Sequence, residues 1–239
     1  MEKSFNKLLN KRRSVRIFKQ KKINSVKVKE CIFNATLAPN SSNLQLWEFI
    51  HICDKNTLKK IAKACFNQNA AKTAQQIVVV IVRKDLWKKR AEQNLDHLKH
   101  ELEKNQITEK RFKKANNYYS KLIPFLYADF FGILSFLRVV LVQTIGLFRP
   151  IYRQVKYTDK RIIAHKSTAL AAQNFMLSMS SIGYATCPME GMDTHMVKKI
   201  LNLTPKSEIN MIIGCGISDE KGVYAKRFRI PFENVYKYI

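Results

Sequence analysis

The spacing of apolar residues along the chain predicts a mixture of helices and short strands. Apolar positions recur at helical spacing in segments 5–9, 28–35 and 58–65, and a further helix is expected at 160–182. Residues 46–53, 77–82 and 208–215 are short apolar runs typical of strands. The run at 77–82, IVVVIV, is rich in β-branched residues, so we expect a buried central strand there. Because strands and helices do not alternate regularly, the pattern favours an α+β fold.

Short polar residues and glycine mark the ends of these elements. The expected helix caps are Ser4, Asn24 or Ser25, Asp54 and Asp193. The second helix should stop before Pro39, and Gly183 should end the long helix at 160–182. That helix is rich in alanine and serine, which suits either a close helix contact at a subunit interface or an ordinary buried helix. Residues 228–239 are predicted to form an extended terminal arm.

The region at about 85–155 differs from the rest of the chain. Residues 85–121 are highly charged and helical in character, and residues 122–148 are mostly apolar but interrupted by Asp129 and Arg138. Three interpretations of 122–148 stay open: a cover over a pocket or dimer surface, an interfacial helix in peripheral membrane contact, or a membrane span. Charges near the middle of a span are costly. We expect one domain over residues 1–239, with 85–155 as an insertion.

The chain is strongly basic, with 43 Lys and Arg against 18 Asp and Glu and a formal net charge of +25. Such a charge favours anionic partners, or it is a lysine-rich surface from compositional bias. No zinc finger or aromatic ribonucleoprotein signature accompanies it, so we expect no nucleic-acid partner. The five cysteines lack paired spacing and the five histidines lack metal-ligand spacing. With no secretory signal at the N-terminus, the expected compartment is the cytoplasm.

Two arginine pairs lie at opposite ends of the sequence. Arg12, Ser14 and Arg16 alternate along an extended segment, which places their side chains on one side. Arg227 and Arg229 have the same spacing. Guanidinium groups bind a dianionic phosphate through paired hydrogen bonds, although each pair alone is also compatible with a solvated surface.

Two polar segments complete the candidate chemistry. Residues 39–47, PNSSNLQLW, carry hydroxyls and amides that suit the edge of a heterocycle, or a capped turn. Residues 187–193, CPMEGMD, are predicted as a loop that leads into a helix. Gly191 permits close approach to a flat ligand, and backbone N–H groups at a helix start carry partial positive charge. An ordinary connecting loop is the alternative.

In order and spacing, the four segments together resemble the nitroreductase family, which has the motifs Arg-x-Ser-x-Arg/Lys, Pro-Ser-Ser-x-Asn-x-Gln-x-Trp, Pro-x-Glu-Gly-x-Asp and Lys/Arg-x-Arg-x-Pro. The resemblance covers nearly the whole chain except about 85–155, which varies in the family. It implies a three-layer fold with a central mixed or antiparallel sheet flanked by helices and an extended C-terminal arm. The sequence departs at Asn40, where serine is commoner, and at Leu46, where proline is commoner.

The resemblance implies an FMN-dependent oxidoreductase and a homodimer. Hydride would pass from NADH or NADPH through flavin N5 to an acceptor such as a nitroaromatic or a quinone, in a ping-pong mechanism without a catalytic side chain. Alternatives are enone reduction or reductive dehalogenation on the same fold, or a basic protein that binds membrane surfaces or nucleic acid. A Rossmann site is disfavoured because Asp219 stands where a third glycine belongs.

The resemblance also assigns cofactor-binding residues. Arg12, Ser14, Arg227 and Arg229 would hold the FMN phosphate, with Arg13 in the same segment and Arg16 near the pyrimidine end of the flavin. Asn67 would contact the flavin ring, and Pro188, Met189, Glu190 and Gly191 would lie by its reactive face. The neighbouring subunit would contribute Asn40, Ser41, Asn43 and Gln45.

Overall fold

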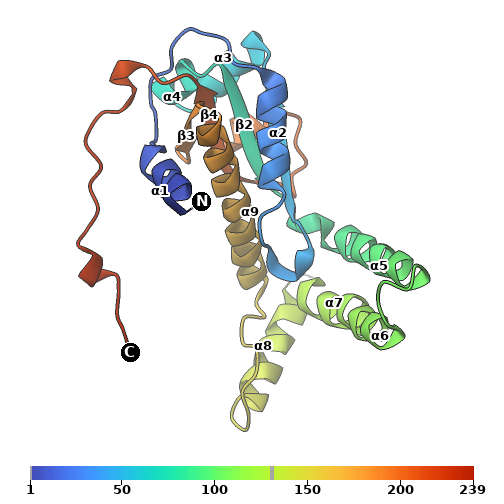
Figure 1. Cartoon of the computed structure of the whole chain (residues 1–239). Coiled ribbons are helices and arrows are strands. Elements are labelled where there is room, and N and C mark those ends of the chain that lie inside the picture. The colour runs from blue at the N-terminus through green and yellow to red at the C-terminus, as the bar shows by residue number, and fades with distance from the viewer. Residues whose placement is uncertain (1, 130–131) are drawn as a thin grey trace.

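The protein, described by a computed structural model over residues 2–129 and 132–239, is built on one antiparallel sheet (Figure 1). Its strands are β1 (Trp47–Ile52), β2 (Gln76–Val82), β3 (Ala185–Met189) and β4 (Glu208–Gly216), in the order β1-β2-β4-β3. Every residue of β2 is buried, which confirms the predicted central strand.

Helices cover both faces of this sheet and extend beyond one of its ends. Their bounds are α1 (Glu2–Lys11), α2 (Ser25–Ala35), α3 (Lys55–Ala64), α4 (Asn69–Lys72), α5 (Trp87–Glu103), α6 (Glu109–Asn117), α7 (Ile123–Tyr127), α8 (Ile133–Ile145), α9 (Tyr157–Ser181) and α10 (Thr194–Ile200). A π-helical turn at Tyr118–Leu122 links α6 to α7. Short 3-10 turns lie at Ser41–Asn43, Lys84–Leu86, Glu220–Gly222 and Phe232–Asn234.

The alternation of side chains along β2 divides the core into two layers. Val78 and Val80 point toward α2 and α9, where they pack with Phe175. Ile77 and Val79 point to the other face, where residues of α3 and α10 cover them. The resulting helix–sheet–helix arrangement confirms the α+β class and the three layers.

Helices α5 to α8 form an arm that projects from the end of the sheet where β1 begins (Figure 1). Within the arm, the two charges of the apolar segment meet: Arg138 Nη2 lies 3.7 Å from Asp129 Oδ1. Arg138 also donates to the carbonyl oxygens of Phe125 and Ala128. Among the described residues, no helix combines the length and the apolar character needed to cross a membrane.

Three boundaries differ from expectation. The first helix begins at Glu2, ahead of Ser4, because glutamate and lysine at positions 2 and 3 are good helix formers. The long helix begins at Tyr157, where the Asp159 carboxylate accepts from the backbone N–H of Lys156 at 2.9 Å. Residues 187–189, predicted as loop, belong to β3, and the loop is limited to residues 190–193.

Pro188 explains why β3 escaped prediction. Proline has no backbone N–H and normally argues against a strand, but it is tolerated at the edge of a sheet. Because β3 is an edge strand, Pro188 faces Ile213 of β4 without interrupting the sheet's interior.

The C-terminal segment is extended, as predicted. After Gly222 it runs past α1 and away from the sheet (Figure 1). Its apolar side chains are exposed within one chain, including Phe228, Ile230, Phe232 and Tyr238.

Candidate functional site

The segment that follows α1 is fixed between two parts of the chain. Ser14 bridges to Thr186 of β3, and the N–H of Val15 donates to the Thr186 carbonyl oxygen at 3.0 Å. On the other side, the N–H of Arg16 donates to the carbonyl oxygen of Gly222 at 2.7 Å. The arginine segment therefore lies beside both the edge strand and the start of the C-terminal arm.

This placement brings the two arginine pairs together in one groove of about 470 Å³. The groove is lined by Arg12, Arg13, Ser14, Arg16 and residues 223–229. None of the lining residues that the structure describes is acidic. The predicted meeting of the two pairs is thus observed, and the groove presents guanidinium groups without a counter-charge.

Two of these arginines join the end of α1 and the residues after it to the C-terminal segment through hydrogen bonds. Arg13 Nη2 donates to the carbonyl oxygen of Ala225 at 2.6 Å. Arg227 donates to the carbonyl oxygens of Leu9, Asn10 and Arg12, at 3.3, 3.1 and 2.5 Å. These acceptors are at the end of α1, where helix carbonyls lack partners and a cation is favourable. Arg13 and Arg227 therefore position the groove.

Electrostatics in the groove favour an anion. Partial burial lowers the pKa of Arg12, and the charges of Arg227, Arg229 and Arg13 lower it further. A shift in this direction means that the charged form of Arg12 is destabilised by its surroundings. A bound phosphate would reverse that effect, because its negative charge stabilises each guanidinium.

A chain of contacts continues from the groove to the loop after β3. The guanidinium of Arg16 lies over the ring of Tyr224, 5.3 Å from its centroid. The Tyr224 hydroxyl accepts from Asn69 Nδ2 at 3.1 Å, and the adjacent Gln68 donates to the carbonyl oxygen of Gly191 at 2.7 Å. Three of the four predicted segments, together with the loop that contains Asn67, therefore lie in one region.

The loop at 190–193 is held from both sides. The Asp193 side chain caps α10 by accepting from the N–H of Met196 at 2.9 Å, and its own N–H donates to the Ala64 carbonyl oxygen at 2.8 Å. Met189 is buried in the core, so only its backbone is available to a ligand, whereas Glu190 and Gly191 are exposed. Burial raises the pKa of Cys187, and the charge of Arg16 partly opposes that rise.

The polar turn at residues 40–45 lies elsewhere. It precedes β1, at the end of the sheet where Trp47 pairs with Val82, whereas Ser14 and Thr186 lie at the other end, near Gln76 and Cys215. The seven residues of β2 separate the two ends by about 20 Å. Within one chain, the turn and the arginine groove are therefore apart.

The turn nevertheless has a defined conformation that side-chain hydrogen bonds stabilise. Ser42, Asn43 and Gln45 adopt positive φ angles of 57°, 50° and 48°, a conformation that is costly for residues other than glycine. Asn43 Nδ2 donates to Asn94 Oδ1 at 2.8 Å, and Asn94 Nδ2 donates back to the Asn43 carbonyl oxygen at 3.0 Å. Asn40 Oδ1 accepts from the N–H of Gln45 at 2.9 Å. Ser41 is also held, since its N–H donates to Ser167 Oγ at 3.2 Å.

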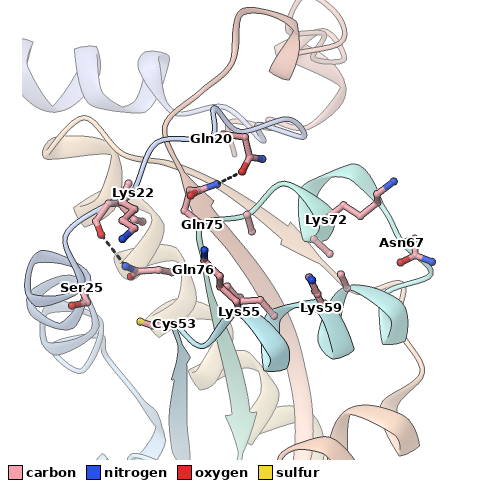
Figure 2. Close-up of a pocket in the computed structure, with 15 residues that line it drawn as sticks. Gln20, Lys22, Ser25, Cys53, Lys55, Lys59, Asn67, Lys72, Gln75 and Gln76 are labelled. Carbon is pink, nitrogen blue, oxygen red and sulfur yellow. Dashed lines mark hydrogen bonds between the residues drawn. The ribbon is translucent and has the colours of Figure 1, made fainter.

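A larger groove, of about 820 Å³, lies along α3 and contains only Asn67 of the predicted site residues. Figure 2 shows Lys55 and Lys59 of α3, Lys72 of α4 and Lys22 around it, with Asn67 at one edge. All four lysines are exposed. Its size alone does not make it the candidate site, because it does not contain the arginine pairs.

Three contributors to the candidate site were missing from the sequence-based prediction: Gln68, Asn69 and Tyr224. Their side chains join the predicted segments to one another through the contacts described above. Proximity was the available signal, since Gln68 and Asn69 follow Asn67 directly and Tyr224 lies three residues before Arg227.

Comparison with known proteins gives a consistent result. The sequence profile of the Nitroreductase family matches residues 9–217. MhqN of Bacillus subtilis, named as an NAD(P)H nitroreductase, is 24% identical over 238 residues, which is 98% of each chain. The structure of ydfN from Bacillus subtilis, named as a nitroreductase, superposes with a TM-score of 0.77 and 22% identity over 100% of both chains. A nitroreductase from Exiguobacterium sibiricum, crystallised with FMN, superposes with a TM-score of 0.69 and 19% identity over 98% and 97% of the two chains.

Proposed function

Because the chain belongs to the nitroreductase family, we propose that it is an FMN-dependent oxidoreductase that uses NADH or NADPH to reduce a small-molecule acceptor, such as a nitroaromatic or a quinone. When bound, FMN would supply the chemistry, accepting hydride at N5 and passing it to the acceptor in a ping-pong sequence. The observation that carries the proposal is the groove in which Arg12, Arg16 and Arg229 meet without a carboxylate among the described lining residues.

The groove fits the phosphate end of this cofactor. Arg12 and Arg229 would bind the phosphate oxygens, and Ser14 would donate its hydroxyl hydrogen. Arg13 and Arg227 would hold the two ends of the chain in place through their bonds to backbone carbonyls. Burial and the neighbouring charges of Arg227, Arg229 and Arg13 lower the pKa of Arg12, which supports an anionic ligand.

The remaining residues of this region would bind the flavin ring. Arg16, held over Tyr224, would lie near the pyrimidine end, where positive charge favours the reduced anion. Glu190 and Gly191 would present backbone N–H groups to the reactive edge, with Pro188 beside them and buried Met189 contributing its backbone only. Asn67 would bind the ring from the loop between α3 and α4. The bond from Gln68 to Gly191 supports this arrangement because it ties that loop to residues 190–191.

We further propose a homodimer in which each flavin contacts both subunits. The turn with Asn40, Ser41, Asn43 and Gln45 lies at the far end of the sheet from its own arginine groove, so it would reach the flavin of the partner. Its strained backbone supports a binding role, because such conformations concentrate at ligand sites. The exposed apolar residues of the C-terminal arm support a second subunit that covers them.

We place the protein in a reducing compartment, the cytoplasm, on the ground that its five cysteines are all free thiols. Peripheral membrane contact through residues 122–148 is compatible with the exposed apolar face of α8, which includes Ile133, Phe136 and Leu137.

A direct experiment tests the proposed function. The purified protein is denatured and the released flavin is identified by chromatography, and the apoprotein is then titrated with FMN. We expect release or uptake of one FMN per chain, together with oxidation of NADH or NADPH when an acceptor such as menadione is added. A protein that neither releases nor takes up FMN would refute the proposal.

A further inference from the structure

An apolar cavity of about 380 Å³ lies at the base of the helical arm, away from the arginine groove. Its walls come from Ser41 and Ser42 of the polar turn, the π-helical turn, α7, the end of α8, the connection to α9 and the first turns of α9. Tyr127, Val142 and Val155 are buried in its depth, whereas Leu122, Phe125 and Tyr152 are partly exposed at its opening. The cavity is in the size range of small-molecule sites.

One cation lies in this apolar surrounding. Lys160 also lines the cavity, and only 3% of its surface is exposed. Its Nζ donates to the carbonyl oxygen of Gln154 at 2.8 Å and to the Tyr152 hydroxyl at 3.5 Å. An ammonium group has three N–H bonds, so one donor position is left without a partner among the described residues.

Neutralisation of Lys160 from within the chain is weak. None of the described lining residues is acidic. Asp159, next in sequence, is directed to the start of its own helix, where it accepts from the N–H of Lys156 at 2.9 Å. The other groups around Lys160 are the phenols of Tyr127 and Tyr152 and the cation Arg138 of α8, which is paired with Asp129.

We propose that this cavity binds an apolar molecule that carries a single carboxylate, with its apolar part against α7 and α8 and its carboxylate on the ammonium of Lys160. A buried cation without a counter-charge is costly, and a carboxylate in the cavity would offset that cost. The apolar walls select against ligands that are charged along their length. Ser41, which the proposed dimer would place at the partner's flavin, also lines the cavity, but the contact of the carboxylate with Lys160 uses residues of one chain and can be measured without FMN.

The titration of Lys160 supplies a readout on the unmodified protein. Burial lowers the pKa of Lys160 to about 8, with Asp159 opposing the shift and Arg138 adding to it. The ligand carboxylate stays ionised throughout this range, so carboxylate binding should weaken as Lys160 loses its proton above this pKa. An exposed lysine would keep its charge to much higher pH.

The test uses octanoate as the probe, with 1-octanol and octyltrimethylammonium as neutral and cationic molecules of equal chain length, in calorimetric titrations of the whole protein. We expect octanoate to bind most tightly, and its affinity to fall about tenfold or more between pH 7 and pH 9.5 while that of octanol stays constant. Binding of octyltrimethylammonium as tight as that of octanoate would overturn the proposal, as would octanoate affinity that is independent of pH.

Three substitutions complete the test. Lys160→Met should lower octanoate affinity about tenfold or more and leave octanol affinity unchanged, because only the charge-assisted contact is lost. Lys166→Met, at an exposed position of the same helix, should change neither affinity. If Lys160→Met does not fold, Val142→Phe provides the test. The larger side chain should fill the cavity and abolish binding of both octanoate and octanol. Unchanged octanoate binding in this variant would refute the site.

Discussion

The guanidinium of Arg227 donates to the main-chain carbonyl oxygen of Arg12 at 2.5 Å. An anchoring arginine thereby holds the backbone of an arginine whose own side chain is left for a ligand. The five guanidinium groups of the groove repel one another, and the carbonyl acceptors at the end of α1 allow that of Arg227 to approach closely. This division of roles leads to different expectations for the individual arginines.

Substitution of Arg12 should weaken the binding of FMN selectively. We expect Arg12→Ala to cost about 1.5–3 kcal/mol of FMN binding, the range for a hydrogen bond to a charged group. Riboflavin lacks the phosphate, so its affinity should hardly change. Quenching of flavin fluorescence by the apoprotein measures both affinities. Equal losses for the two flavins would indicate a folding defect in place of a lost phosphate contact.

Substitution of Arg227 should affect stability as well as binding. Arg227→Ala removes the partners of three backbone carbonyls, so we expect both a lower thermal unfolding temperature and weaker FMN binding. Arg229→Ala is the matched comparison, because the only hydrogen bond found for its side chain among the described residues goes to the adjacent Phe228 carbonyl oxygen. It should weaken FMN binding without lowering the unfolding temperature, and a reversed pattern would contradict the assigned roles.

A methyl group at position 222 should displace the arm that carries Arg227 and Arg229. A Cβ atom on Gly222 would lie 2.5 Å from the Ile17 carbonyl oxygen and 2.8 Å from Val15 Cγ1. We expect Gly222→Ala to lower the free energy of unfolding by about 1–3 kcal/mol, as overpacking does, and to reduce flavin content. Chemical denaturation measures the former. Wild-type stability in this variant would show that the contact can relax freely.

Removal of residues 232–239 should lower the dimer population and flavin occupancy together. Exposed Val235, Tyr236 and Tyr238 have little to pack against in their own chain, so the proposed dimer is what would bury them. Sedimentation analysis and absorbance of the bound flavin report the two quantities. A truncated protein that is monomeric, yellow and active would refute the shared site.

Residues 122–148 should not form a membrane-spanning segment. Asp129 and Arg138 would each cost roughly 2.5–3.5 kcal/mol at hydrocarbon depth on insertion scales. In the fold Arg138 of α8 is paired with Asp129. Alkaline carbonate should therefore release any membrane-bound protein into the supernatant. Retention in the pellet would contradict this expectation.

Much of the fold could be predicted because its signals are local. Asn24 and Asp54 cap their helices through hydrogen bonds from residues two or three positions ahead. The run of β-branched residues in β2 directly indicates a buried strand. Strand β3 was missed because proline normally argues against a strand. Pro188 is tolerated because β3 lies at the edge of the sheet, and the order of strands in the sheet cannot be read from local sequence. The start of α1 was misplaced for a smaller reason, since helix ends are weakly specified.

The candidate site was predictable only in part. The paired arginines could be picked out by their spacing, but the backbone acceptors of Arg13 and Arg227 have no sequence signature. The cavity around Lys160 was also beyond reach, because its walls come from segments that are merely apolar in sequence. In the sequence, nothing distinguishes Lys160 from the other lysines of this basic chain, and only the fold shows that it is buried.

The hydrogen bonds from Arg227 to the end of α1 have a consequence for biosynthesis. Arg227 is 215 residues from Arg12, so the carbonyl bonds that shape the arginine groove cannot form while the ribosome is still making the intervening chain. The sheet has all its strands by Gly216, before Arg227 is translated. The proposed phosphate groove therefore cannot be complete before the segment with Arg227 and Arg229 has been made, so FMN binding there would follow translation of both arginine pairs.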